Sequence, residues 1–144
     1  MRNVELALRK AYKTAIEAAN TGAFFSFGEA LQNNNYGAAI VVKSISTNEI
    51  TNKEISHVDA RVTIVVTTNK LTSNDGVNCA NITDKILEAI YQNQRSKLDL
   101  SEYNLQCYNT NLISQNTDSW SVQNQVVYVD TTLVFLHKIF IKPN

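Results

Sequence analysis

The chain of 144 residues carries 13 basic and 13 acidic side chains, so its formal net charge is zero. This length is typical of one domain, and a hydrophobic content of 44% is enough for a core that needs neither disulfides nor a metal ion. Binding to nucleic acid through phosphate contacts requires a basic excess, which the composition does not provide. We therefore expect a single domain over residues 1–144 and no sequence-specific binding of nucleic acid.

No segment of the sequence is apolar for long enough to cross a membrane. The longest apolar-rich run, residues 126–141, is interrupted by Asp130, His137 and Lys138, whereas a helical span needs about 20 apolar residues. The first five residues also lack the basic patch and apolar stretch of a secretory signal. These features predict a cytoplasmic product with no membrane partner.

The first element predicted is a helix over residues 4–19, with Asn3 as its N-cap and Gly22 available for a left-handed residue after its end. Residues 23–37, which include three phenylalanines, are interpreted as an irregular connection anchored by these aromatics. The helix is indicated by apolar residues that recur at spacings of three and four: Val4, Leu8, Ala11, Tyr12, Ala15 and Ala19.

Two strands are predicted next. Residues 38–45 are rich in β-branched side chains, which is typical of a strand covered on both faces. Residues 58–68 alternate between apolar and mixed positions, which indicates a half-buried antiparallel strand. Asn74-Asp75-Gly76 then predicts a turn.

A second helix is predicted over residues 78–92, followed by a strand around residues 103–108. The polar region 109–124, which contains Trp120, is interpreted as a loop. Two further short strands are possible, at residues 48–56 and 112–115.

The chain ends in a long strand over residues 125–141. At about 3.3 Å per residue this run is longer than a domain of this size, so a bend or bulge is expected near residues 130–132. Both sides of the strand are apolar, with Phe135 on one and Phe140 on the other. One side can pack against helices, and the other needs a further cover, for which a neighbouring subunit is a candidate.

This order of elements predicts an α+β fold. Strands that occur in runs between isolated helices favour a mostly antiparallel sheet with two helices on one face and a long C-terminal strand.

Residues with catalytic potential are few and dispersed. His57 and Asp59 lie on the same face of a predicted strand, at a spacing that suits a base and its orienting group or two metal ligands. The alternative, a surface pair at the start of a strand, is favoured because no third ligand accompanies them. His137 lies in the apolar series of the last strand and is interpreted as a hydrogen-bonded, partly buried imidazole. Asp84 and Glu88 are interpreted as an exposed acidic helix face.

Other chemical motifs are missing from the sequence. It contains no G-x-S-x-G elbow, and its four glycines form no phosphate-binding loop. Cys79 and Cys107 belong to no C-x-x-C pair and are expected to be reduced, packed thiols. We therefore expect no cofactor, no metal ion and no enzymatic activity. Trp120 is the most informative single residue, since an aromatic in a polar region either folds onto the core or anchors a contact.

The whole pattern resembles the tail-terminator and head–tail completion (neck ring) proteins of tailed bacteriophages. The resemblance lies in the order of elements, and it covers nearly the whole chain. It rests on a leading helix with small residues on one face, Tyr36-Gly37 before an apolar strand, the alternating strand 58–66, a middle helix ending in Ile86-Leu87-Glu88-Ala89-Ile90, a polar region and the long closing strand.

The resemblance implies a structural virion protein that forms a homo-oligomeric ring at the head–tail junction after assembly in the host cytoplasm. Its partners would be copies of itself and neighbouring neck or tail proteins. Neighbour contacts are expected in the loops 47–57, 69–78 and 113–124. The candidate interface residues are Trp120, Asn74, Asp75, Tyr128 and Phe140.

Two alternatives remain open at this point. One is a small cytoplasmic module that presents its sheet to a single protein partner. The other is a small enzyme whose site is assembled in space from His57, Asp59 and His137.

Overall fold

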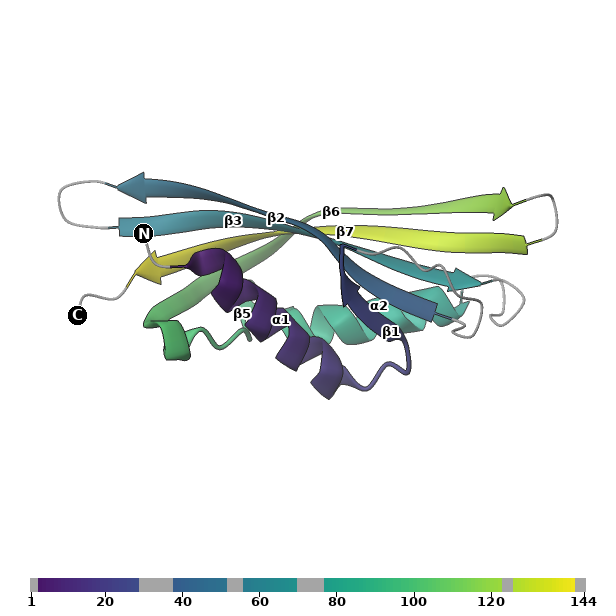
Figure 1. Ribbon diagram of the computed structural model, residues 1–144, viewed down its shortest axis with the longest axis horizontal. Helices are drawn as coiled ribbons and strands as arrows, with labels where there is room; N and C mark the ends of the chain where they lie inside the picture. Colours follow the sequence, from purple (N-terminus) through teal and green to yellow (C-terminus); the bar gives the residue numbers. More distant parts are fainter. Residues whose placement is uncertain (1–2, 29–37, 52–55, 70–76, 123–125, 142–144) are drawn as a thin grey trace.

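A five-stranded sheet runs the length of the molecule, and two helices cover one of its faces (Figure 1). The computed structural model describes residues 3–28, 38–51, 56–69, 77–122 and 126–141. The strand order is β1-β2-β3-β7-β6, in which β1 is parallel to β2 and every other pair is antiparallel. The elements are α1 (Val4–Ala19), β1 (Phe24–Phe27), β2 (Ala38–Thr51), β3 (Ser56–Asn69), α2 (Val77–Ile90), β4 (Tyr91–Gln92), β5 (Arg95–Ser96), the 3₁₀ helix η1 (Ser101–Tyr103), β6 (Leu105–Val122) and β7 (Val126–Ile141). The predicted α+β class is confirmed.

Helix α1 begins and ends where the sequence predicts. The side chain of Asn3 accepts a hydrogen bond from the backbone N–H of Leu6 at 2.9 Å, so Asn3 is the N-cap. The left-handed residue at the C-cap is Asn20, with φ 52°, rather than Gly22, although Gly22 also has a positive φ of 77°. Asn tolerates this conformation because its short polar side chain can bond locally.

Helix α2 packs its apolar side onto the sheet and ends two residues earlier than predicted. Cys79, Ile82, Ile86 and Ile90 are buried at helical spacing. After Ile90 the chain forms the two-stranded β4–β5 hairpin. Its turn residues, Asn93 and Gln94, have φ values of 50° and 65°, and two positive φ angles are what a tight two-residue hairpin requires.

Strand β3 confirms the predicted alternation, and its neighbour β7 also alternates in burial. The side chains that face the helices form the core and are fully buried, including Ile64 of β3 and Leu133 and Phe135 of β7. The intervening side chains face away from the helices and are mostly half-buried. The helices therefore cover one face of the sheet, and β7 also carries apolar side chains such as Leu136 and Phe140 on the other.

One strand was not predicted, and two extend beyond their predicted limits. Residues 24–27 form β1 rather than an irregular connection, because they pair with β2 over Ala39 to Val42. Strand β2 continues to Thr51 and includes the polar residues that follow Ile45. Strand β6 continues to Val122, so the predicted loop over 109–124 is wrong as far as the described residues reach. The possible short strand at 112–115 is part of β6, and residues 48–51 of the one at 48–56 are part of β2, whereas residues 52–55 lie outside the described part of the chain. Residues 29–37 and 70–76, with the turn at Asn74-Asp75-Gly76, lie outside the described part of the chain.

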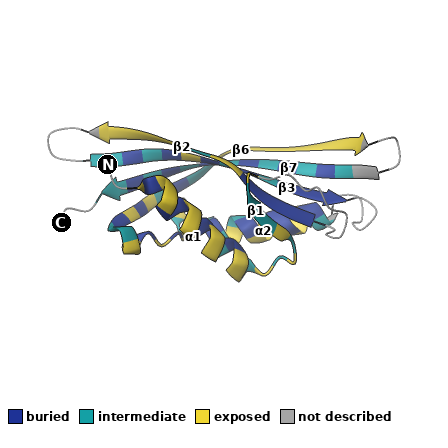
Figure 2. Cartoon of the chain, viewed as in Figure 1, coloured by how far each residue is buried: buried dark blue, intermediate teal, exposed yellow. Residues whose placement is uncertain are grey.

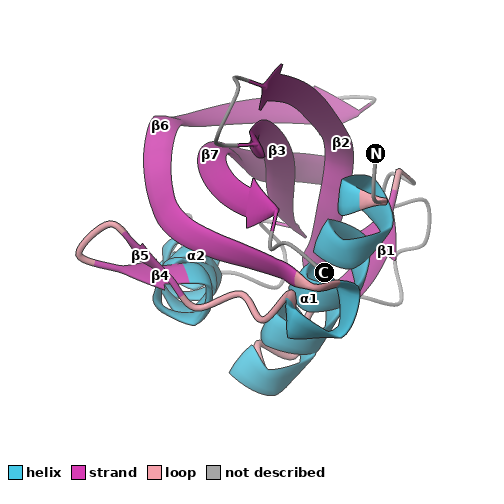
Figure 3. Ribbon diagram, turned by 90° about the vertical axis from the view of Figure 1, so that its left-hand side faces the viewer, coloured by secondary structure: helices cyan, strands magenta, loops and turns pink. Residues whose placement is uncertain are grey.

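A bend or bulge was predicted near residues 130–132, and the bulge is wrong, because the register shifts occur in the strands that flank the central pair. Strand β7 pairs with β3 in continuous register from Tyr128 to Phe140. The register shifts occur between Val42 and Ser44 of β2, and between Cys107 and Asn109 and between Leu112 and Ser114 of β6. An extra residue bends the strand that carries it. Consistent with this, β2 and β6 curve around the central pair (Figure 3).

The long strands produce two hairpin arms at opposite ends of the molecule. The distal parts of β2 and β3 form the β2–β3 arm at one end, and those of β6 and β7 form the β6–β7 arm at the other (Figure 1). The outer strand of each arm is largely exposed (Figure 2). Within the described residues, none of the helices is both long and apolar enough to cross a membrane.

Candidate assembly surface

The face of the sheet opposite the helices, here called the outer face, is left uncovered by α1 and α2. From Tyr128 to Phe140 of β7 the outer-face residues are the even-numbered ones, and each is only half-buried, whereas the odd-numbered ones between them are buried. The register aligns outer-face residues of neighbouring strands in rows across the sheet. From the β2–β3 arm inward, the rows through β7 contain Phe140, Lys138, Leu136, Val134, Thr132, Asp130 and Tyr128.

Apolar and aromatic side chains gather on the outer face near the end of the β2–β3 arm. Tyr108 and Phe140 meet edge to face, with ring centroids 6.5 Å apart. Tyr108 occupies one of the β6 bulges and is 45% exposed. Ile50, 38% exposed, lies in the same row as Phe140, with His57 between them. This end of the outer face therefore presents an apolar patch to its surroundings.

Trp120 lies in a strand on the outer face of the β6–β7 arm, not in a loop. It pairs with Tyr128 across the arm, and the two rings stack with centroids 4.4 Å apart and an interplanar angle of 18°. Its indole N–H donates a hydrogen bond of 2.7 Å to Oδ2 of Asp130. The side chain remains 41% exposed, so it does not fold onto the core. Of the two interpretations of Trp120, the structure therefore favours an accessible aromatic that is fixed in place by its neighbours.

Charged side chains on the outer face are unevenly distributed. Arg61 and Lys138 lie in adjacent rows near the β2–β3 arm, where Asp59 is the cross-strand neighbour of Lys138. Asp118 and Asp130 face each other directly across the β6–β7 arm. The ion pairs among the described residues are on α1 instead, where Arg9 binds Glu5 at 3.2 Å and Lys10 binds Glu102 at 3.8 Å.

The three residues of the enzyme alternative do not come together. His57 and Asp59 point to the outer face of β3, in the rows of Phe140 and Lys138. His137 points to the opposite face and is completely buried. The sheet itself therefore separates the two groups. In the described ranges, no cluster of three or more histidine, cysteine or acidic side chains is arranged to hold a metal ion.

His137 instead forms a buried polar cluster under α1. Its Nε2 shares a hydrogen bond with the hydroxyl of Tyr12, and its Nδ1 lies 2.8 Å from Oγ1 of Thr110. Burial lowers the pKa of His137 to about 3 and raises the pKa of Tyr12 well above its ordinary value. The imidazole is thus neutral at pH 7 and shielded from solvent, and it ties α1 to the sheet. Both residues belong to predicted apolar series, but their contact could not be read from sequence.

The cysteines are free, buried thiols, as predicted. The thiol of Cys79 lies 3.3 Å from Oγ1 of Thr131, and that of Cys107 lies 3.6 Å from Oγ1 of Thr110. Burial raises the pKa of Cys107 above its usual value. This environment disfavours the thiolate and so makes Cys107 a poor nucleophile.

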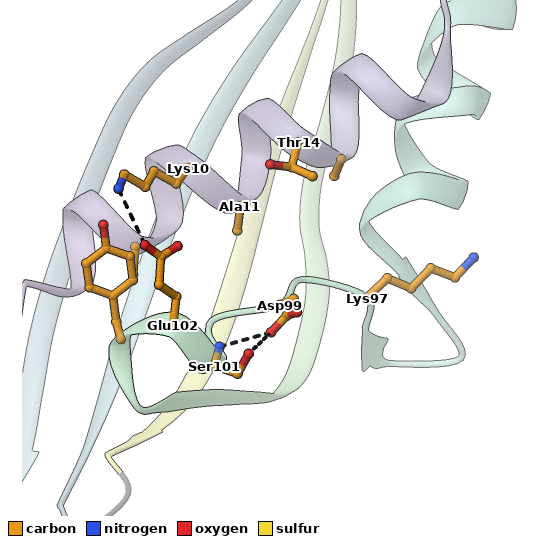
Figure 4. Close-up of a pocket in the computed structure, with 10 residues that line it drawn as sticks. Lys10, Ala11, Thr14, Lys97, Asp99, Ser101 and Glu102 are labelled. Carbon is orange, nitrogen blue, oxygen red and sulfur yellow. Dashed lines mark hydrogen bonds and ion pairs between the residues drawn. The ribbon is translucent and has the colours of Figure 1, made fainter.

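A cavity of about 260 Å³ lies between α1 and the segment that leads into η1 (Figure 4). Its charged groups are already partnered. Lys10 pairs with Glu102, Asp99 accepts hydrogen bonds from the backbone N–H and the hydroxyl of Ser101, and Lys97 donates to a backbone carbonyl of α2 at 2.6 Å. The arrangement fastens η1 to the helices, and its lining contains no nucleophile with an adjacent base.

Of the five candidate interface residues, three lie on described strands of the outer face. Trp120 and Tyr128 are stacked on the β6–β7 arm, and Phe140 lies at the other end with Tyr108. Asn74 and Asp75 lie outside the described residues. Sequence reasoning did not find Asp118, Asp130 and Arg61, because their significance depends on the register of the sheet.

Comparison with known proteins supports the fold and goes no further. No family model matches the chain, and no curated protein sequence matches it either. Among solved structures, the chain is similar to one in the virion of a native gene transfer agent (GTA) particle, with a TM-score of 0.68 and 12% sequence identity. The match covers 97% of this chain and 99% of that chain. At this identity the likeness establishes a shared fold over practically the whole length of both chains.

Proposed function

We propose that the protein is a structural component of a phage-like virion, in which copies of the chain form a ring at the head–tail junction as a tail terminator or neck component. The observation that carries the proposal is the similarity to a chain of the GTA virion, which leaves almost no part of either chain unmatched. A fold alone does not determine function. The proposal therefore also needs support from the surface of this chain.

The outer face supplies that support. It exposes aromatic and apolar side chains on a sheet whose other face is covered by the chain's own helices. Aromatic residues such as Trp120 and Tyr108 are enriched at protein interfaces, where they supply much of the binding energy. We propose that Trp120, Tyr128 and Phe140 contact neighbouring subunits or neighbouring neck and tail proteins. Residues 1–144 would act as a single domain in this assembly.

The oligomeric state of the purified protein tests the proposal. Light scattering after size exclusion and native mass spectrometry, over a range from micromolar to near-millimolar protein, should give one closed assembly of more than two subunits, and electron microscopy should show rings. A protein that stays monomeric at the highest concentration contradicts the proposal. A one-to-one complex with a different protein, without self-association, would instead indicate a binding module.

The position in the particle needs a separate measurement. Antibodies against the chain, applied to intact particles, should label the junction between head and tail. Label distributed along the tail or over the capsid would contradict the proposed position but not the structural role.

A further inference from the structure

The two ends of the outer face carry net charges of opposite sign among their described residues, although Asp59 lies beside Lys138 at the basic end. Near the β2–β3 arm, Arg61 is exposed and lies one row from Lys138. On the β6–β7 arm, Asp118 is exposed and lies directly opposite Asp130. The formal net charge of the whole chain is zero, so the separation is a matter of placement and not of composition.

Among the described residues, the acidic end has no ion-pair partner. Like charges directly opposite each other in a sheet are destabilising. Neither Asp118 nor Asp130 forms an ion pair with a described residue. Along β7, Asp130 and Lys138 are separated by about 26 Å at about 3.3 Å per residue, which is far beyond the screening length of about 8 Å at physiological salt. The basic end of the same chain therefore cannot neutralise this carboxylate pair.

The side chains next to the carboxylates favour a guanidinium as the missing cation. The Trp120–Tyr128 stack occupies the row adjacent to Asp118 and Asp130. An arginine can bind a carboxylate through its fork of N–H groups while its plane lies on an aromatic face, whereas lysine provides only a point charge. Because Trp120 already binds Asp130 through its indole N–H, the exposed carboxylate of Asp118 is the one available to an incoming group.

We propose, on the basis of the ring proposed above, that the outer face of the β6–β7 arm docks onto the basic end of the outer face of a second copy of this chain, with Asp118 facing Arg61 of that copy. The two arms project from opposite ends of the molecule, so copies placed head to tail bring an acidic arm over a basic end (Figure 1). Such a contact uses different surfaces on the two copies. Contacts of this kind form a ring when the rotation between copies closes.

Charge reversal tests the contact in the full-length protein. Arg61→Glu places like charges at both surfaces, and so should raise the dissociation constant of the assembly by about tenfold or more. Asp118→Lys should weaken the assembly in the same direction. The double variant R61E/D118K restores opposite charges with the signs exchanged, so it should recover most of the wild-type association. Mixing the two single variants should also restore assembly.

Matched controls reverse exposed charges on the helical side. Lys13→Glu and Glu17→Lys change the net charge of the chain by the same amounts, but both residues lie on the exposed surface of α1. They should leave the dissociation constant unchanged. Circular dichroism and a urea titration at low concentration confirm that each variant is folded.

The outcomes separate this contact from the ring itself. If the wild-type protein forms rings and the charge reversals behave like the controls, the contact is wrong and the ring stands. If both single variants weaken assembly without rescue by the double variant, the pairing of Asp118 with Arg61 is wrong. If the wild-type protein never associates, the proposed function fails together with the contact.

Discussion

The two faces of β7 are almost equally apolar in sequence, yet they have different surroundings. On the face that meets the helices, Leu133, Phe135 and Ile139 are fully buried. On the outer face, Leu136 and Phe140 are only half-buried. The side chains of the first group stabilise the folded chain, while those of the second remain available to another molecule. Hydrophobicity along a strand thus does not distinguish a core face from a face that is open to another molecule. The two are distinguished by whether other parts of the chain pack on them.

The largest expected difference between the faces concerns stability. Leu133→Ala removes a fully buried side chain and should lower the free energy of unfolding by about 3 to 4 kcal/mol. Leu136→Ala, the same substitution on the outer face of the same strand, should lower it by about 1 kcal/mol because the site is already partly hydrated. Urea titrations at low protein concentration measure both. Equal losses would contradict the distinction between the faces.

The next prediction concerns the pH dependence that the buried imidazole creates. His137 has a pKa of about 3 in the folded chain, against about 6.5 when unfolded. Below pH 6.5 the unfolded state therefore takes up a proton that the folded state does not, and stability falls as the pH is lowered through the window from 6.5 to 3. Between pH 7 and pH 5 the loss should be about 2 kcal/mol.

Variants of the two histidines isolate this effect. His137→Gln should abolish most of the pH dependence between pH 7 and pH 5, whereas His57→Gln, on the outer face, should retain it because His137 is still present. Urea titrations at several pH values supply the free energies. If the free energy of unfolding of His137→Gln falls with pH as steeply as that of the wild type, other groups govern the pH dependence.

A smaller effect is expected at the aromatic pair on the arm. Trp120→Ala removes the stack on Tyr128 and the hydrogen bond to Asp130, and should lower the free energy of unfolding by about 1 kcal/mol. Trp120→Phe keeps a ring on Tyr128 but loses the donor, so it should fall between the wild type and the alanine variant. Thermal and urea unfolding test this order. A loss of about 3 kcal/mol or more would mean that Trp120 belongs to the core.

The smallest effect has the opposite sign. Asp118→Asn relieves the repulsion between two carboxylates that face each other across the arm, and should stabilise the monomer by about 0.3 kcal/mol. Asp84→Asn, an exposed substitution on α2, serves as the control. A set of replicate urea titrations is needed to resolve so small a change. A clear destabilisation by Asp118→Asn would indicate that its carboxylate has a partner within the chain.

Sequence patterns predicted the elements whose burial is periodic. The limits of α1 and the alternation of β3 followed from the spacing of apolar residues, because one face of each is packed against the rest of the chain. The distal half of β6 was missed, since exposed polar side chains there leave no alternation to detect. Its strand conformation comes from pairing with β7, which is a tertiary interaction. The short strand β1 was missed because its conformation likewise depends on a tertiary interaction, the pairing with β2.

The candidate surface was predictable in outline only. The apolar outer face of β7 was visible as a second hydrophobic series, and Trp120 was singled out as a contact residue. The neighbours of Trp120 were not visible, because Tyr128 and Asp130 meet it only through the register of the β6–β7 arm. The opposition of Asp118 to Asp130 follows from the same register. Each of the two β6 bulges shifts the pairing of β6 with β7 by one residue, so the partner of Asp118 could not be found by counting along the sequence.

The pairing of β3 with β7 also has a consequence for the order of folding. The β2–β3 and β6–β7 hairpins each join residues that are close in sequence. The seam between the hairpins, which is the pairing of β3 with β7, joins distant parts of the chain, such as His57 and Phe140. Closing a long loop is slow compared with forming a hairpin. Arg61 and Lys138 come from different hairpins, so the basic end of the outer face exists only after the seam has closed. A nascent chain would therefore be unable to recruit a neighbour through this surface until its own sheet is complete.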